Sequence, residues 1–286
     1  MPVIDLVERG ARPKTAFVLG GGGNLGAIQV GMLRALISRG IEPDLIVGSS
    51  VGALNAAAIA GAPTSAGVGR LAEVWIGLRP DDIFPTGRLT GPWMLLRRAL
   101  SLCANDRLRG VIERCATFDR FEDAEVQVEV VATSLRTGRE HWFGSGPIIE
   151  PILASAALPA VLPPVEIDGE MFIDGAVVDN VPISRALHHG CERIYVLHVG
   201  NFDRPRPRPR RPIDVLLQSF SIARNYRFLA EASAAAPQGV EIFTLPGIDP
   251  GGLKRDDFSR TRELIERASQ VSGAYLDDRQ RAIAGV

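Results

Sequence analysis

The chain has 286 residues, and its 32 lysines and arginines nearly balance 33 aspartates and glutamates, for a net charge of −1. This balance lacks the basic footprint typical of nucleic-acid-binding proteins, so we expect no nucleic acid among its partners. Only 3 cysteines are present, without a CxxC pair, which argues against a disulfide framework or a cysteine-rich zinc site. A chain of this length can fold around its own apolar core, and we expect no metal and no other cofactor.

Targeting signals are absent from the sequence pattern. Residues 1–14 mix acidic and basic side chains with few apolar ones, so they lack the apolar core of a signal peptide. No uncharged apolar run reaches the length of a membrane span. We therefore expect a cytoplasmic protein, and peripheral association with a membrane is compatible with that expectation.

Two strand–glycine–helix units are predicted at the start of the chain. Thr15–Leu19 is a short β-branched and aromatic run that ends in Gly20–Gly23, and a helical pattern follows over 24–37. Residues 44–47 (DLIV) form the second predicted strand, which leads into an alanine-rich helix over 50–60. Apolar strands that alternate with helices indicate an α/β fold with a mainly parallel central sheet covered on both faces, a three-layer α/β/α architecture.

The remaining elements follow after an interruption. Residues 64–121 are helical and loop-like, with little strand character. Further strands are then predicted over 126–133, 137–143, 165–167, 171–173, 193–199 and 240–245. Asp168-Gly169 is a strong two-residue hairpin signal between two of them. Long helices are predicted over 212–236 and 258–284.

One low-complexity segment, residues 204–212 (RPRPRPRRP), precedes the first of these long helices. Its alternating prolines favour an extended conformation, which the like charges stiffen further. A solvated surface loop is the favoured interpretation, because charge runs are usually solvated. Contact with anionic lipid headgroups or an acidic partner is the alternative.

The first motif that carries chemistry is Gly21–Gly26 (GGGNLG), which fits GxGxxG between a strand and a helix. Such a loop lets a ligand approach the backbone, and the helix that follows presents unpaired N–H groups. It suits a diphosphate or a developing oxyanion. A dinucleotide site also requires an acidic residue at the end of the next strand, whereas Asp44 lies at the beginning of that strand. A nucleotide-binding protein is therefore the less favoured hypothesis.

The second motif is a GxSxG sequence, Gly48-Ser49-Ser50-Val51-Gly52. A strand that turns sharply into a helix holds the central serine in a strained, exposed conformation, with its hydroxyl above the sheet. Gly48 and Gly52 are needed because side chains there would collide with neighbouring elements. The motif predicts Ser50 as a nucleophile, and the alternative is an ordinary turn in which Ser50 caps the helix.

A serine nucleophile needs a base, and the histidines are poor candidates for it. Their positions, at a hairpin, at a helix end and inside an apolar strand, are better explained by structure. These residues are His141, His188, His189 and His198.

Carboxylates suit the role of base better. Asp174 follows the strand 171–173 and enters a loop, where partial desolvation can raise its pKa enough for it to accept a proton from Ser50. Asp179 is the second choice, and Asp168 is explained by its turn.

The Gly-rich loop, the GxSxG elbow and the later Asp174-Gly175-Ala176 have the order and spacing of the patatin-like phospholipase family, which the chain resembles. Other similar segments are Ala132-Thr133-Ser134, Ala154–Pro159, Pro163-Pro164-Val165, Phe172–Ala176 and Asp179–Pro182. The resemblance extends from Thr15 to Gly200, about two thirds of the chain.

The resemblance implies hydrolysis of lipid acyl esters by a Ser50–Asp174 dyad without histidine. The backbone of Gly21, Gly22, Gly23 and Asn24 would form the oxyanion hole, and Gly175 and Ala176 would complete the DGA loop. The chain would be one patatin-like domain over 1–286, with a core over 15–200, a helical cap inserted at 64–121 and C-terminal helices over 212–286. An acyl lipid would be the substrate, with peripheral membrane contact through the cap or Arg204–Arg211.

The sequence departs from the family at Leu25, which stands where the family loop carries arginine or lysine. Arg34, Arg70 or the arginines of 204–211 are candidates to supply the missing cation. In the cap, Trp93–Leu100 suits an acyl pocket, a membrane interface or ordinary helix packing. An acyltransferase that uses the same serine and a non-catalytic lipid-binding or scaffold protein are the alternative functions.

Overall fold

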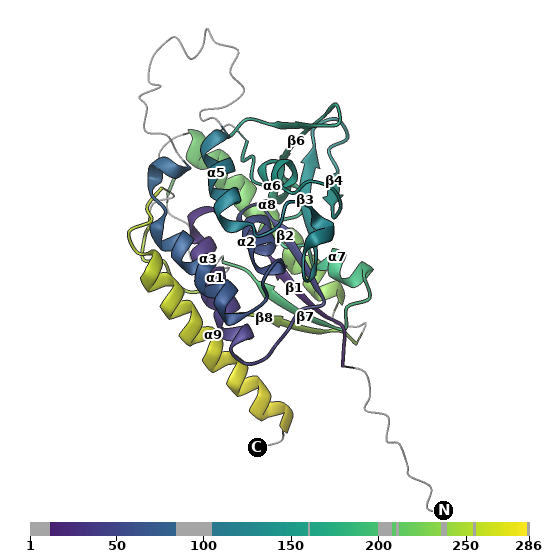
Figure 1. Ribbon diagram of the computed structural model, residues 1–286, viewed down its shortest axis with the longest axis vertical. Helices are drawn as coiled ribbons and strands as arrows, with labels where there is room; N and C mark the ends of the chain where they lie inside the picture. The colour runs from purple at the N-terminus through teal and green to yellow at the C-terminus, as the bar shows by residue number, and fades with distance from the viewer. Residues whose placement is uncertain are drawn as a thin grey trace, which may run out of the picture.

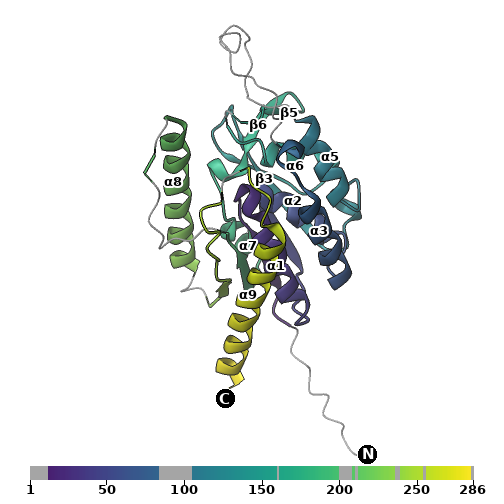
Figure 2. The same ribbon diagram turned by 90° about the vertical axis from the view of Figure 1, so that its left-hand side faces the viewer.

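A computed structural model describes residues 12–83, 105–159, 161–199, 208–209, 212–235, 239–253 and 256–284. In these residues an eight-stranded sheet has the order β5-β6-β3-β2-β1-β7-β8, and β4 pairs with β3. The sheet lies between two layers of helices (Figures 1 and 2). The strands are β1 (Thr15–Leu19), β2 (Leu45–Ser49), β3 (Gln127–Ser134), β4 (Glu140–Phe143), β5 (Val165–Ile167), β6 (Glu170–Asp174), β7 (Arg193–Leu197) and β8 (Glu241–Thr244).

The sheet is mainly parallel. Strands β3, β2, β1, β7 and β8 pair in parallel, and β4, β5 and β6 are antiparallel to their neighbours. Every residue of β1 and β2 is buried, as expected for central strands covered on both faces. The predicted three-layer α/β/α fold is confirmed.

The two helical layers are unequal. Helices α1, α2, α3, α5, α6 and α9 pack against one another on one face, whereas α7 and α8 pack together on the other, so that α8 stands apart at the left of Figure 2. The α-helices in the described part of the chain are α1 (Gly26–Ile37), α2 (Val51–Ala60), α3 (Ser65–Gly77), α5 (Asp106–Cys115), α6 (Ile149–Ser155), α7 (Ile183–His188), α8 (Pro212–Ala235) and α9 (Thr261–Ala284).

Local interactions shift several predicted boundaries. The hairpin strand predicted over 137–143 begins only at Glu140, because the preceding residues form a turn in which Gly138 has a φ of 67°. The last helix begins at Thr261 rather than at Phe258, because the carbonyl of Phe258 accepts hydrogen bonds from the Thr261 backbone and hydroxyl. The Asp168-Gly169 hairpin is confirmed, with φ values of 51° and 77°.

The segment expected to form a cap is described only in part. Its helices α3 and α5 pack beside α2, within the larger helical layer. Residues 84–104, which include Trp93–Leu100, lie outside the described residues, as does most of Arg204–Arg211. The cap therefore stays a prediction. None of the helices in the described ranges has the length and apolar character of a bilayer-spanning segment.

Strands β2 and β6 pair with the same edge of β3, and β6 begins to pair where β2 ends. Val131 pairs with Ser49 of β2 on one side and with β4 on the other. One residue on, Ala132 pairs with β4 and with Asp174 of β6, so β6 must occupy the side that β2 has left. Because β6 runs antiparallel to β3, its carboxyl end at Asp174 meets the carboxyl end of β2 at Ser49.

Candidate active site

Ser50 sits in a strained turn between β2 and α2. Its φ of 56° and ψ of −127° are unusual for a residue with a side chain, and such strain is typical of functional turns. Both neighbouring glycines are required by the packing: a Cβ on Gly48 would come within 2.6 Å of the Gly52 carbonyl oxygen, and one on Gly52 would overlap the Leu19 carbonyl. The turn that the GxSxG motif predicts is therefore present.

Replacing Gly52 by alanine is expected to destabilise the protein by several kcal/mol, because the added methyl group meets backbone that a side-chain rotation cannot clear. Gly69→Ala is the matched control. Gly69 lies inside α3 with nothing within 4 Å of an added Cβ, so this change should be neutral or stabilising by up to about 1 kcal/mol. Urea denaturation midpoints of the two variants test the prediction, and a normal midpoint for Gly52→Ala would contradict it.

The Ser50 hydroxyl donates a hydrogen bond of 2.8 Å to Oδ2 of Asp174. Oδ1 of the same carboxylate accepts the N–H of Ala176, also at 2.8 Å. Asp174 is only 2% exposed. Burial raises its pKa to about 6, against the opposing effect of the Ala176 and Ser50 hydrogen bonds and the charge of Arg224. The carboxylate is thus ionised at neutral pH, yet basic enough to accept a proton.

The backbone around Asp174 is held on three sides. The Thr133 hydroxyl donates to its carbonyl at 2.8 Å, and its own N–H donates to the Ala157 carbonyl at 3.0 Å. A Cβ on Gly175 would overlap the Val131 carbonyl, so a glycine is needed where the loop passes β3. Three of the segments that resemble the family, Ala132–Ser134, Ala154–Pro159 and Asp174–Ala176, therefore meet at this one point of the fold.

Ser155 is a site residue that the sequence reasoning missed. Its hydroxyl accepts the backbone N–H of Ser50 at 2.9 Å, and its side chain is fully buried at the end of α6. The hydrogen bond gives the strained turn an acceptor from a separate element. The sequence signal for it is the Ala154–Pro159 segment, which is among those similar to the family.

The Gly-rich loop lies over Ser50. A Cβ on Gly21 would come within 3.0 Å of Ser50 Cβ. The Gly21 N–H donates to the Asn180 carbonyl at 3.1 Å, so it is already engaged, unlike what we expected of an oxyanion donor. Among the described residues, the N–H groups of Gly22 and Gly23 form no hydrogen bond. These two remain the candidate donors.

For Asn24, the fourth residue expected in the oxyanion hole, the prediction concerns the backbone, and its side chain contacts another segment. Its side-chain amide donates to the Asp257 carbonyl at 2.9 Å, in the segment before α9. The side chain thus ties the loop to the C-terminal region.

A network of buried hydrogen bonds connects the start of the Gly-rich loop to helices α1, α2 and α3. Gln29 of α1 donates to the carbonyl of Gly20 at 2.6 Å and accepts from Asn55 of α2 at 2.8 Å. Trp75 of α3 donates its indole N–H to Asn55, also at 2.8 Å. Three helices therefore fix one loop, a preorganisation that suits stabilisation of a developing charge.

Asp179, the second choice as base, faces a different partner. Its backbone carbonyl accepts the Ser49 hydroxyl at 2.8 Å, and its carboxylate lies 3.5 Å from Arg227 of α8. Burial, together with the charge of nearby Glu231, raises the pKa of Asp179 to about 8, against the opposing effect of Arg227. Asp174 is thus the carboxylate that the structure joins to Ser50.

Three of the four histidines occupy structural positions. His141 packs on Phe143 and Phe172, and His189 pairs with Glu129 at 3.0 Å. His198 is buried after β7 and stacks on Phe228 of α8, with its pKa lowered to about 4 by burial and by Arg224.

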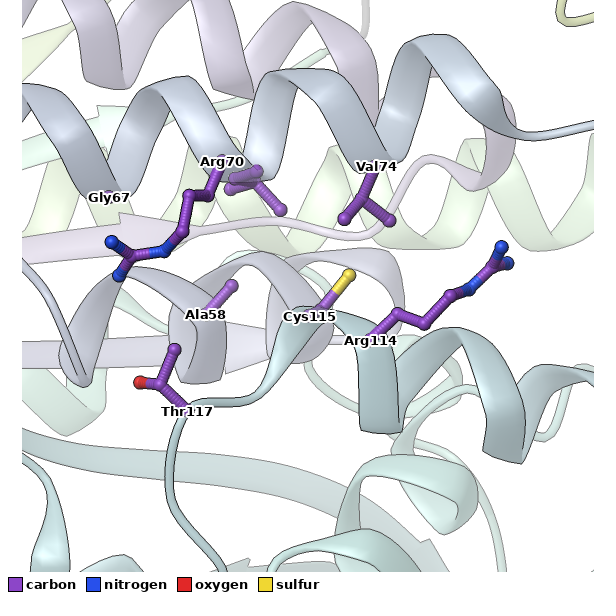
Figure 3. Close-up of a pocket in the computed structure, with 8 residues that line it drawn as sticks. Ala58, Gly67, Arg70, Val74, Arg114, Cys115 and Thr117 are labelled. Carbon is purple, nitrogen blue, oxygen red and sulfur yellow. The ribbon is translucent and has the colours of Figure 1, made fainter.

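Two cations considered as substitutes for the missing loop residue lie elsewhere. Arg70 lines a pocket with Ala58 near the carboxyl end of α2 (Figure 3). Since Ala58 is eight residues beyond Ser50, the pocket lies about 12 Å along the helix from the elbow. Arg34 lies similarly far along α1 from its start at Gly26.

Arg224 of α8, which sequence reasoning did not consider, is near enough to lower the pKa of both Asp174 and His198.

Two other types of site lack support in the described residues. Asp44, at the wrong end of β2 for a nucleotide, accepts the Thr15 N–H and pairs with Arg12. No group of three or more histidine, cysteine, aspartate or glutamate side chains there could hold a metal ion.

Comparison with known sequences identifies the same region. The family model described as Patatin-like phospholipase matches residues 17–187. A lysophospholipase of Aspergillus terreus, nte1, is 27% identical over 71% of this chain, which spans 13% of that protein. Lysophospholipase NTE1 of Candida glabrata is 32% identical over 66% of this chain, which spans 11% of it. An uncharacterized NTE family protein of Mycobacterium tuberculosis is 31% identical over 64% of this chain, and the matched region makes up 48% of that protein.

Among solved structures, VipD from Legionella pneumophila is similar with a TM-score of 0.50 and 13% identity, over 94% of this chain and 67% of that one. At this identity the likeness concerns the fold alone. The chain covers about half or less of the length of the curated relatives above, so their full activities do not transfer with the shared domain.

Proposed function

The chain belongs to the patatin-like phospholipase family, and we propose that it is a lipid acyl hydrolase in which Ser50 is the nucleophile and Asp174 its base. The observation that carries the proposal is the 2.8 Å hydrogen bond from the Ser50 hydroxyl to the buried Asp174 carboxylate. A nucleophile needs an activating base within hydrogen-bond reach, and this pair meets the requirement.

The reaction would proceed through an acyl-enzyme. Asp174 takes the hydroxyl proton as Ser50 Oγ attacks the acyl carbonyl, and the N–H groups of Gly22 and Gly23 donate to the resulting oxyanion. Asp174 then returns the proton to the leaving alcohol. In the second half, Asp174 takes a proton from a water molecule that attacks the acyl group on Ser50; the bond to Ser50 Oγ breaks, Asp174 returns the proton to Oγ, and the fatty acid leaves.

A lysophospholipid is the proposed substrate class. Two relatives with the same domain are named lysophospholipases. Arg224 lies near Asp174 and could meet the phosphate in place of the cation that Leu25 replaces. Contact with a lipid surface through 64–121 or 204–211 belongs to the same proposal, although most of 204–211 and part of 64–121 lie outside the described residues.

Covalent labelling combined with a lipid panel tests the function. The protein should react with a fluorophosphonate probe at Ser50, located by peptide mass spectrometry. It should also release fatty acid from a lysophospholipid. Absence of labelling and of hydrolysis would instead favour a non-catalytic lipid-binding protein on this fold.

The pH dependence of kcat/KM should report the ionisation of Asp174. Because the base acts as the carboxylate, activity should be constant above about pH 7. It should then fall tenfold per pH unit below the pKa of about 6. A soluble short-chain ester keeps substrate ionisation out of the profile. An acid limb near pH 8 would contradict the assignment, since that is the pKa to which burial raises Asp179.

Ser155→Ala should lower kcat about ten- to hundredfold and leave KM nearly unchanged. The change leaves the Ser50 N–H without the acceptor that holds it now, a loss worth about 1–3 kcal/mol in a buried site. Ser272→Ala removes an equally buried hydroxyl from α9 and should behave as wild type. Steady-state kinetics and the rate of fluorophosphonate labelling measure the effect. Equal kinetics for both variants would show that the Ser155 hydrogen bond does not position the nucleophile.

A further inference from the structure

Helix α8 carries a row of exposed apolar side chains. Val215, Ile222, Tyr226 and Leu229 are 52%, 53%, 78% and 52% exposed. Their spacings of seven, four and three residues place them on one face of the helix. We call these four residues the α8 stripe. Exposed apolar side chains that gather on one element are typical of an interaction surface, unlike single ones scattered over a protein.

The opposite face of α8 attaches the helix to the site. Arg227 donates to the Val178 carbonyl and pairs with Glu140 at 3.0 Å, and Phe228 stacks on His198. At 100° per residue, both side chains lie on the side away from the α8 stripe. Arg227 and Phe228 thus face the protein, whereas the four apolar side chains of the α8 stripe face outward. Figure 2 shows α8 at the outer edge of the molecule.

The charge of the sequence next to α8 indicates which kind of partner covers the α8 stripe. The sequence directly before α8 contains five arginines within residues 204–211, in a chain whose overall charge is −1. An anionic lipid surface offers both an apolar phase for the stripe and negative headgroups for these arginines. A second copy of the chain would cover the stripe, but its net charge of −1 is far less negative than an anionic lipid surface. Tyr226, the most exposed member, has the amphipathic ring favoured at membrane–water boundaries.

We propose that the α8 stripe is the surface by which this protein docks on an anionic lipid surface. The inference rests on the proposed function for its purpose, since a lipid hydrolase must reach its substrate. Because the inner face of α8 contacts the loop that follows Asp174, docking would bring the lipid surface within about one helix diameter, 10 Å, of that loop.

Vesicle sedimentation tests the docking directly. Vesicles of equal parts phosphatidylglycerol and phosphatidylcholine should bind the full chain, more weakly as salt is raised. The combined variant Ile222→Gln, Tyr226→Gln and Leu229→Gln should bind at least ten times more weakly. Leu135→Gln is the matched control, because Leu135 is equally exposed, at 51%, in the turn after β3, and this variant should bind as wild type. Circular dichroism melting verifies that all variants fold.

Three results would overturn the proposal: no binding of the wild type, equal binding of the combined variant and wild type, or an equal loss in the Leu135 control. A wild-type dimer that the combined variant turns into a monomer would assign the stripe to self-association instead. Hydrolysis of a soluble short-chain ester should be the same in all variants. If that hydrolysis is absent while vesicle binding behaves as expected, the proposed function fails and the docking surface stands.

Discussion

Ser50→Ala is expected to reduce ester hydrolysis at least about ten-thousandfold, to the residual rate that binding and the oxyanion donors supply without a nucleophile. Labelling by a fluorophosphonate should disappear completely. The fold should persist, because alanine meets the same backbone requirement at φ 56° as serine and the change removes one half-buried hydroxyl. The release of fatty acid and the mass of the labelled protein measure the two effects.

The neighbouring serine provides the control for this variant. Ser49 is fully buried at the end of β2, and its hydroxyl donates to the Asp179 carbonyl at 2.8 Å. Ser49→Ala removes a hydroxyl from the same motif without touching the reacting atoms, so labelling should remain and the rate should stay within about tenfold of wild type. Labelling or hydrolysis that survives in Ser50→Ala would exclude Ser50 as the nucleophile.

Local sequence predicted the elbow well because its constraints are local. Residues 44–52 contain the apolar strand, the serine and both glycines, and each glycine is required by backbone only a few residues away or in the adjacent strand. The hairpin at Asp168-Gly169 was predictable for the same reason, since positive φ at two consecutive residues is a property of the dipeptide.

The contacts between distant segments could not be read from periodicity. Asp174 reaches Ser50 because β6 takes the edge of β3 that β2 leaves, and register between distant strands leaves no mark on the pattern of either strand. The hydrogen bonds of the Ser155 hydroxyl and of the Gly21 N–H also join segments that are far apart in sequence. Likewise Arg224 was overlooked because α8 is far from the motifs in sequence, and only its packing brings it to the site.

Asp174→Asn is expected to lower kcat about a hundred- to ten-thousandfold, the usual contribution of a general base, while the protein keeps or gains stability. Burial raises the pKa of Asp174 from 3.8 to about 6, so the folded protein binds this proton more tightly than the unfolded chain. The stabilisation from the protonated carboxyl is complete below pH 3.8 and is lost as pH rises through 6. At pH 8 the buried carboxylate therefore opposes folding by up to about 3 kcal/mol.

Asparagine avoids the buried charge but loses one acceptor, since two donors, Ser50 and Ala176, now share the two carboxylate oxygens. The balance predicts an unfolding free energy for Asp174→Asn at pH 8 that is equal to or above that of wild type. Its advantage should vanish below pH 4. Urea denaturation at both pH values measures this difference, and a stable but inactive variant would separate the loss of the base from loss of the fold.

Asp179→Asn discriminates between the two buried carboxylates. The pKa of Asp179 is raised to about 8, so this group is largely neutral at pH 7 and asparagine resembles it closely. Its carboxylate faces Arg227 rather than Ser50, and we expect a kcat within about tenfold of wild type. If instead Asp179→Asn lost activity and Asp174→Asn kept it, the base would be Asp179. The Ser50–Asp174 hydrogen bond would then serve only to shape the elbow.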